Sequence, residues 1–112
     1  YVSPNSNKSR CVSGFRICVQ HGSAGIGTQV QDIRVSVLSG GDDDQKEVYH
    51  HMVGTFVVPK VAPGTNLFFD FDKTYQDIKI VRFEFLNNYR RSEKEISYGS
   101  VYLYANSGIN NQ

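Results

Sequence analysis

The sequence of 112 residues has no tryptophan, one methionine and only two cysteines. It contains no apolar run near the roughly 18 residues of a membrane-spanning helix, and no long stretch with the apolar period of an amphipathic helix. Its first residues lack the apolar core of a signal peptide. We therefore expect no membrane span and no helix of more than about one turn. A secreted or cell-surface location is expected, with its signal already removed.

A concentration of charge of one sign is also lacking. Twelve Lys and Arg residues balance eleven Asp and Glu residues, for a formal net charge of +1, and both signs occur in each half. Nucleic-acid and membrane-surface binders need a concentrated basic face, so neither partner is predicted. No Ser or Cys stands in a recognisable context for an activated nucleophile, and we expect no enzymatic activity.

The length of the chain fits one domain. Polar residues dominate both ends, and no low-complexity linker divides the sequence between them. We predict a polar arm at 1–10, one domain at 11–105 and a polar tail at 106–112.

A two-residue apolar period is the main pattern within that domain. In the segment 76–86, Val81, Phe83 and Phe85 share one face, while the other face mixes apolar and charged residues. This alternation predicts a β-strand, and its apolar content favours a place near the middle of a sheet. Similar patterns predict further strands at 12–21, 29–38, 47–59, 67–72 and 96–105. The expected fold is an all-β antiparallel sandwich or jelly roll, with a closed barrel as the alternative.

Glycines mark two irregular places in this pattern. Gly22, Gly25 and Gly27 follow the first strand and could suggest a phosphate-binding loop. No Gly-Lys-Ser/Thr follows, and the segment 29–38 alternates in twos, so we interpret the glycines as a connection between strands. Gly54 lies inside a predicted strand, where glycine is typical of a bulge or bend.

The two cysteines, Cys11 and Cys18, lie close together in the sequence. An extended chain of seven residues spans about 23 Å, so they can form a disulfide only if the chain turns at Ser13-Gly14. An even cysteine count in a small β protein favours the disulfide. Two reduced thiols are the alternative.

Acidic residues suggest a calcium site. Asp42, Asp43 and Asp44 are consecutive, and Asp70 and Asp72 share one face of the strand at 67–72. Calcium is bound by several carboxylate and carbonyl oxygens, which this group of residues could supply if the chain brings them together. The alternative is a solvated hairpin tip at residues 42–44.

Tyrosines and a polar loop suggest a binding surface. Tyr98, Tyr102 and Tyr104 recur on one face of the last predicted strand. Aromatic faces stack on the apolar faces of sugar rings, whereas the alternative places these rings in a core. The loop before this strand adds side chains that can bind hydroxyl groups, and loops commonly carry binding residues. These side chains are Asn87, Asn88 and Arg90.

The end of the chain, with an apolar strand, a polar loop and the short GSVYLYA strand, resembles jelly-roll carbohydrate-binding modules in general architecture. No diagnostic motif of those modules is present, and tryptophan, their usual stacking residue, is missing. The sequence predicts a non-enzymatic, lectin-like module that binds a glycan or glycoprotein, with Ca²⁺ as its candidate cofactor. The alternative is a protein-interaction or adhesion domain that could form oligomers.

Overall fold

The computed structural model describes residues 3, 11–23, 25–39, 49–92 and 94–105. These residues form strands, loops and one short 3₁₀ helix, and every pairing between named strands is antiparallel. The prediction of an all-β antiparallel fold is confirmed. The elements are β1 (Val12–Cys18), η1 (Ile26–Thr28), β2 (Asp32–Ser39), β3 (Tyr49–Val57), β4 (Asn66–Tyr75), β5 (Ile78–Phe85) and β6 (Val101–Tyr104).

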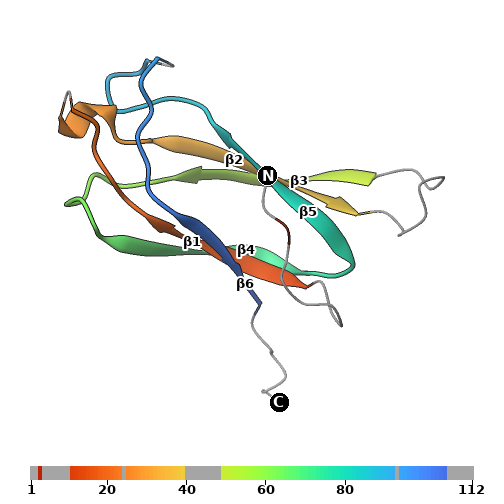
Figure 1. The fold of residues 1–112 in the computed structure, drawn as a ribbon. Coiled ribbons are helices and arrows are strands. Elements are labelled where there is room, and N and C mark those ends of the chain that lie inside the picture. The colour runs from red at the N-terminus through yellow and green to blue at the C-terminus, as the bar shows by residue number, and fades with distance from the viewer. Residues whose placement is uncertain (1–2, 4–10, 24, 40–48, 93, 106–112) are drawn as a thin grey trace.

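Two three-stranded sheets lie one above the other, as Figure 1 shows. One sheet has the strand order β4-β1-β6, and the other has the order β3-β2-β5. Only β2 and β3 are neighbours both along the chain and in a sheet, because the other connections cross from one sheet to the other. Each sheet therefore joins distant parts of the sequence, and β1 and β2 are the central strands.

The predicted central position of the segment 76–86 is wrong, since β5 lies at the edge of its sheet. Its apolar face does point inward as expected: Val81 is fully buried, and Phe83 and Phe85 pack against the core. Arg82 and Glu84 lie on the opposite face and form an ion pair of 3.6 Å. A strand in an antiparallel sheet needs only one apolar face when the other faces water, so this pattern suits an edge position as well.

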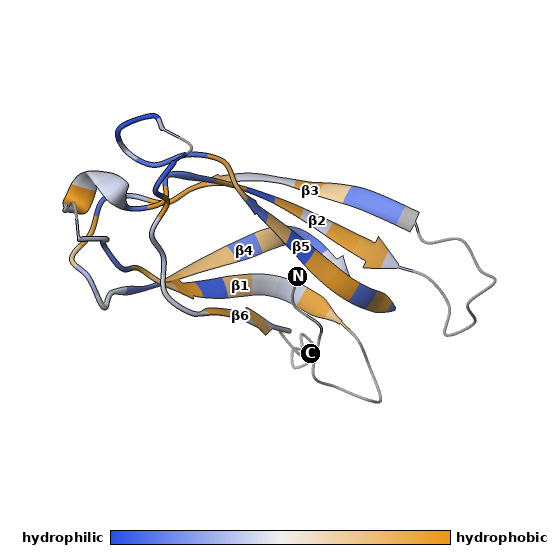
Figure 2. Cartoon of the chain, turned by 45° about the horizontal axis from the view of Figure 1, so that its top comes forward, coloured by the Kyte–Doolittle hydropathy of each residue, from blue (hydrophilic) through white to orange (hydrophobic). Residues whose placement is uncertain are grey.

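The core between the two sheets is centred on Phe15 of β1, which is 0% exposed. Its ring lies 5.3 Å from that of Phe56 on β3 and 5.1 Å from that of Phe83 on β5, measured between centroids. Within its own sheet it contacts Phe69 and Phe71 of β4, at 5.1 and 6.2 Å. One aromatic cluster therefore joins both sheets. Figure 2 shows hydrophobic residues along β2 and β5, and polar residues in the loops near η1.

Irregularities in strand pairing, two of them in the β3-β2-β5 sheet, decide which side chains face this core. Val35 pairs with Gly54 and the next residue, Ser36, pairs with Met52, which leaves Val53 as an extra residue in β3. The bulge predicted at Gly54 is thus confirmed, and the positive φ of 153° there is one that L side chains rarely adopt.

The second irregularity lies in β5, where Ile80 pairs with Leu38 but Ile78 pairs with the adjacent Ser39. The extra residue, Lys79, turns Ile78 into the core, where it is 3% exposed. Simple alternation placed Ile78 on the mixed face, because a bulge that reverses the parity leaves no clear signal in the sequence.

The structure contains no disulfide between Cys11 and Cys18. Ser13 and Gly14 belong to β1, so the turn that the disulfide requires is absent. This fold therefore gives the predicted disulfide no support. The reason is that Gly14 lies within β1, where it pairs with Asp70 of β4 and Tyr104 of β6, and does not form a turn.

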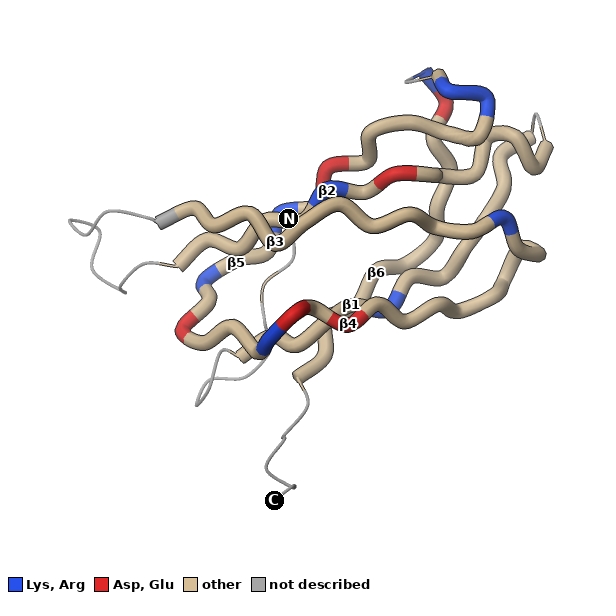
Figure 3. The backbone as a smooth tube through the Cα atoms, turned by 180° about the vertical axis from the view of Figure 1, so that it is seen from behind, with Lys and Arg blue, Asp and Glu red and all other residues tan. Residues whose placement is uncertain are grey.

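Charged residues of both signs are spread over strands and loops, as the tube in Figure 3 shows. Among the described residues, no helix is long and apolar enough to cross a membrane. The arm at 1–10, apart from Ser3, and the tail at 106–112 lie outside the residues that the structure describes.

Candidate functional site

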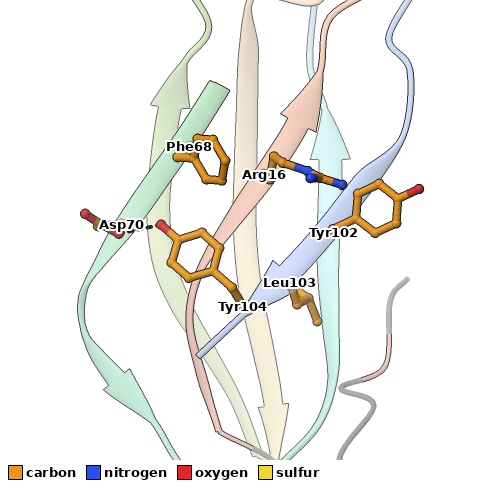
Figure 4. A pocket seen from close by; sticks show the side chains of 6 residues that line it. All are labelled: Arg16, Phe68, Asp70, Tyr102, Leu103 and Tyr104. Carbon is orange, nitrogen blue, oxygen red and sulfur yellow. Dashed lines mark hydrogen bonds between the residues drawn. The ribbon is translucent and has the colours of Figure 1, made fainter. Parts of the chain in front are cut away.

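An open groove of about 500 Å³ lies on the outer face of the β4-β1-β6 sheet. Two rows of paired residues cross the three strands there. Phe68, Arg16 and Tyr102 form one row, from β4 through β1 to β6. Asp70, Gly14 and Tyr104 form the next row, in the same strand order. The lining residues, shown in Figure 4, are Arg16, Phe68, Asp70, Tyr102, Leu103 and Tyr104.

Strand alternation explains why these residues face outward. Phe15 and Ile17 are fully buried in the core, so Gly14 and Arg16 between them must lie on the opposite face of β1. The same alternation on β4 turns Phe68 and Asp70 away from the core. The groove therefore lies on the outer side of the strand that carries the core's central ring.

Gly14 makes room for the Tyr104 ring. A Cβ at this position would collide with the Tyr104 ring and with the backbone oxygen of Phe69. Without that atom, Tyr104 extends from β6 across β1, and its hydroxyl donates a hydrogen bond to the Asp70 carboxylate on β4. Burial and the neighbouring carboxylate both raise the pKa of Tyr104. The phenol therefore stays protonated at neutral pH, as the donor of this bond.

Two largely exposed aromatic rings lie at the sides of the groove. Phe68 is 66% exposed and Tyr102 is 52% exposed. The Phe68 ring also lies 6.1 Å from the Tyr104 ring, at an angle of 57°. Exposed rings on an open sheet face offer flat apolar surfaces to a ligand.

Arg16 lies between these exposed rings. Its guanidinium carbon is 4.4 Å from the centroid of the Tyr102 ring, which is a cation–π contact. The Nε atom is buried and has no hydrogen-bond partner. The ion pairs that join two described residues link Arg34 and Arg82 to Glu84, and none of these includes Arg16.

Tyr102 and Tyr104 thus meet in the groove, but Tyr98 does not join them. The predicted strand at 96–105 is regular only over β6, and the chain departs from it at Gly99, whose N–H donates to the Cys18 carbonyl. The Tyr98 ring stacks on Phe85 at 4.0 Å and 14°. The prediction that three tyrosines share one row was wrong for Tyr98, because the strand is interrupted.

The loop residues that were predicted to bind a ligand lie outside the groove, and the two asparagines among them bind groups of the protein itself. Asn87 accepts a hydrogen bond from the Asp32 N–H (3.0 Å) and donates one to the Asp32 carboxylate (2.8 Å). Arg90 is exposed and lies beside Gly27. Neither Asn87, Asn88 nor Arg90 lines the groove.

Asn88 is 2% exposed and is fully engaged with the backbone. Its Nδ2 donates to the Glu95 carbonyl at 2.8 Å, and its Oδ1 accepts from the N–H groups of Arg90 and Ser92 at 2.9 and 3.0 Å. An amide that is buried and bonded in this way closes the loop and is not accessible to a ligand. The prediction that Asn88 binds ligand is not supported by this geometry.

We predict that Asn88→Ala lowers the free energy of unfolding by about 2 kcal/mol, because buried backbone groups lose their partners. Urea denaturation of both proteins would measure the difference. Asn66→Ala, at an exposed position on β4, is the matched control and should change stability by less than about 0.5 kcal/mol. Equal stability of the two variants would contradict the structural role of Asn88.

The acidic residues do not gather into a metal site in the described part of the chain. Asp70 accepts from Tyr104, and Asp72 accepts from the Tyr75 hydroxyl at 2.6 Å. That bond lowers the pKa of Asp72, while burial and the carboxylate raise the pKa of Tyr75 to about 12. No group of three or more His, Cys, Asp or Glu among the described residues could hold a metal ion. Asp42, Asp43 and Asp44 lie outside the described residues.

Sequence reasoning missed Arg16, Phe68 and the open position at Gly14. The sequence did contain a signal for them. Gly14 and Arg16 alternate with Phe15 and Ile17, and Phe68 directly precedes Phe69, so in half-buried strands all three must face outward. What the sequence lacked was the pairing that places them beside Tyr102 and Tyr104.

Comparisons of the chain with protein-family models, with curated proteins and with solved structures found no match.

Proposed function

We propose that the protein is a non-enzymatic carbohydrate-binding module, a small β-sandwich of jelly-roll type whose groove holds a sugar ring. One observation carries the proposal: two largely exposed rings, Phe68 and Tyr102, flank a charged side chain on the outer face of a sheet. Aromatic faces bind the apolar faces of a sugar, and charged groups beside them bind its hydroxyls.

The size and polarity of the groove support this proposal. Its volume of about 500 Å³ lies within the range of ordinary small-ligand sites. Arg16 offers hydrogen-bond donors, and the Asp70 carboxylate retains acceptor capacity beyond its bond with Tyr104. A sugar needs both kinds of partner, because each hydroxyl both donates and accepts.

A binding role is favoured over hydrolysis. Glycosidases most often use two carboxylic groups on either side of the bond that they cleave. Asp70 is the one carboxylate among the residues that line this groove. The proposal therefore assigns recognition, without chemistry, to the site.

The experiment is isothermal titration of the full chain with neutral and acidic oligosaccharides, with added calcium and with chelator. Calcium is included because residues 42–44 carry the sequence-based prediction of a calcium site. For a sugar that binds, Phe68→Ala should weaken the affinity about tenfold, or about 1.4 kcal/mol. Met52→Ala, which removes an exposed apolar side chain from the outer face of the other sheet, should leave the affinity unchanged.

The thermal stability of both variants should stay close to that of the parent, because both side chains are exposed. The proposal fails if no sugar of the panel binds, or if Phe68→Ala binds every sugar as well as the parent does.

A second candidate is protein recognition or adhesion by a secreted or cell-surface domain. It is favoured by the residue types in the groove, since tyrosine and arginine are frequent anchors of protein interfaces. Sedimentation over a range of concentrations distinguishes self-association from the sugar-binding role. A mass that rises with concentration in the parent but not in Phe68→Ala would favour adhesion.

A further inference from the structure

We infer that the groove selects acidic glycans, and that Arg16 binds a carboxylate carried by the sugar ring. This inference rests on the proposed function, because it specifies which sugars the same groove holds. It goes beyond that function because it specifies the charge of the ligand and the residue that binds the charged group.

The first argument is the unmatched charge of Arg16. No carboxylate of the described residues forms an ion pair with it, although Asp70 lines the same groove. Its Nε is buried without an acceptor. A guanidinium without a carboxylate beside it is incompletely paired, and a ligand carboxylate at the part of Arg16 that lines the groove supplies that partner. A carboxylate matches the planar fork of a guanidinium better than a hydroxyl does.

The second argument is that Arg16 is already held in place. Its guanidinium stacks on Tyr102, and its neighbours in the row are Phe68 on one side and Tyr102 on the other. Neighbouring strands lie about 4.8 Å apart, so the row spans the width of one or two sugar residues. A sugar packed on the Phe68 ring would therefore have its substituents within reach of Arg16. Because the side chain is preorganised, little rotamer entropy is lost on binding.

The third argument is the direction of the charges. Arg16 extends toward Tyr102 and away from Asp70, whose carboxylate is turned toward the Tyr104 hydroxyl (Figure 4). The groove is thus positive at one end and negative at the other. A sugar acid would place its carboxylate at Arg16 and its hydroxyls near Asp70, because a carboxylate beside Asp70 would be repelled.

The test compares trigalacturonate with its fully methyl-esterified form, which keeps the rings and removes the charge. Titration of the parent should give at least tenfold tighter binding of the acid, and added salt should reduce that preference. In Arg16→Met the preference should fall to about twofold or less, because the affinity for the acid should fall much further than the affinity for the ester. Arg16→Lys, which keeps the charge but loses the fork, should give an intermediate preference.

Arg82→Met is the matched control, since it removes the same charge from the outer face of the other sheet and should retain the full preference. Equal binding of acid and ester by the parent would overturn the inference, and so would a preference that survives in Arg16→Met. If Arg16→Met does not fold, a full preference in Arg16→Lys would overturn it instead. Each of these outcomes leaves the proposed function intact. If triglutamate binds as tightly as trigalacturonate, the groove recognises negative charge without requiring a sugar ring, and the inference also fails. If neither these sugars nor the neutral panel binds the parent, the proposed function itself fails.

Discussion

Replacing Phe15 by alanine is expected to lower the free energy of unfolding by about 3–5 kcal/mol. Phe15 is fully buried, and its ring contacts rings from both sheets. Removing it leaves a cavity at the place where the two sheets meet, and the surrounding rings can only partly close that space. For a domain of this size, such a loss is a large share of the total stability.

The measurement is urea denaturation followed by circular dichroism, with Phe68→Ala as the control. Phe68 is the same residue type on the neighbouring strand β4, but its ring is 66% exposed. We expect its replacement to change stability by less than about 0.5 kcal/mol. Similar losses in the two variants would contradict the assignment of Phe15 to the core and of Phe68 to the groove.

Gly14→Ala is the second large effect: we expect it to lower the free energy of unfolding by about 3 kcal/mol and to abolish the sugar binding that we propose for the groove. The added methyl group meets the Phe69 backbone oxygen and the Tyr104 ring at once. The backbone cannot move without disturbing the β1–β4 pairing, and the ring can move only by giving up its hydrogen bond to Asp70. Both the stability and the shape of the groove should therefore change together.

Gly27→Ala provides the matched control for this substitution. The atoms closest to a Cβ at Gly27 belong to the long, exposed side chain of Arg90 and none of them to the backbone, so this position can adjust more easily than Gly14. Its replacement should cost less than about 1 kcal/mol and leave the groove unaffected. If Gly14→Ala is as stable as Gly27→Ala, the close approach of Tyr104 over β1 would be contradicted.

The loop at 87–92 shows why the prediction of ligand-binding side chains from sequence was only partly correct. Asn88 carries a side chain that suits a sugar hydroxyl, but in the folded chain it binds the backbone of its own loop. The same amide chemistry serves both roles, and the choice between them depends on which backbone groups the fold leaves without partners. The composition of the sequence and the spacing of its residues do not predict which backbone groups these are.

The sequence by itself determined the class of the fold and, where no bulge intervenes, the inward face of a strand. Alternation placed Val81, Phe83 and Phe85 of β5 on one face, and that face packs against the core because side chains of a strand point to opposite sides in turn. Gly54 marked its bulge for an equally local reason, since its backbone conformation disfavours other residues.

Only the tertiary structure decided which strands lie together and therefore what the groove contains. Any strand can pair with any other through the same backbone hydrogen bonds, so alternation fixes the face of a residue but not its neighbours. Arg16, Phe68 and Tyr102 come from three distant segments and meet because β1 pairs with β4 on one side and β6 on the other. The physical reason is that packing of the shared core selects the strand order, and the groove on the outer face follows from it.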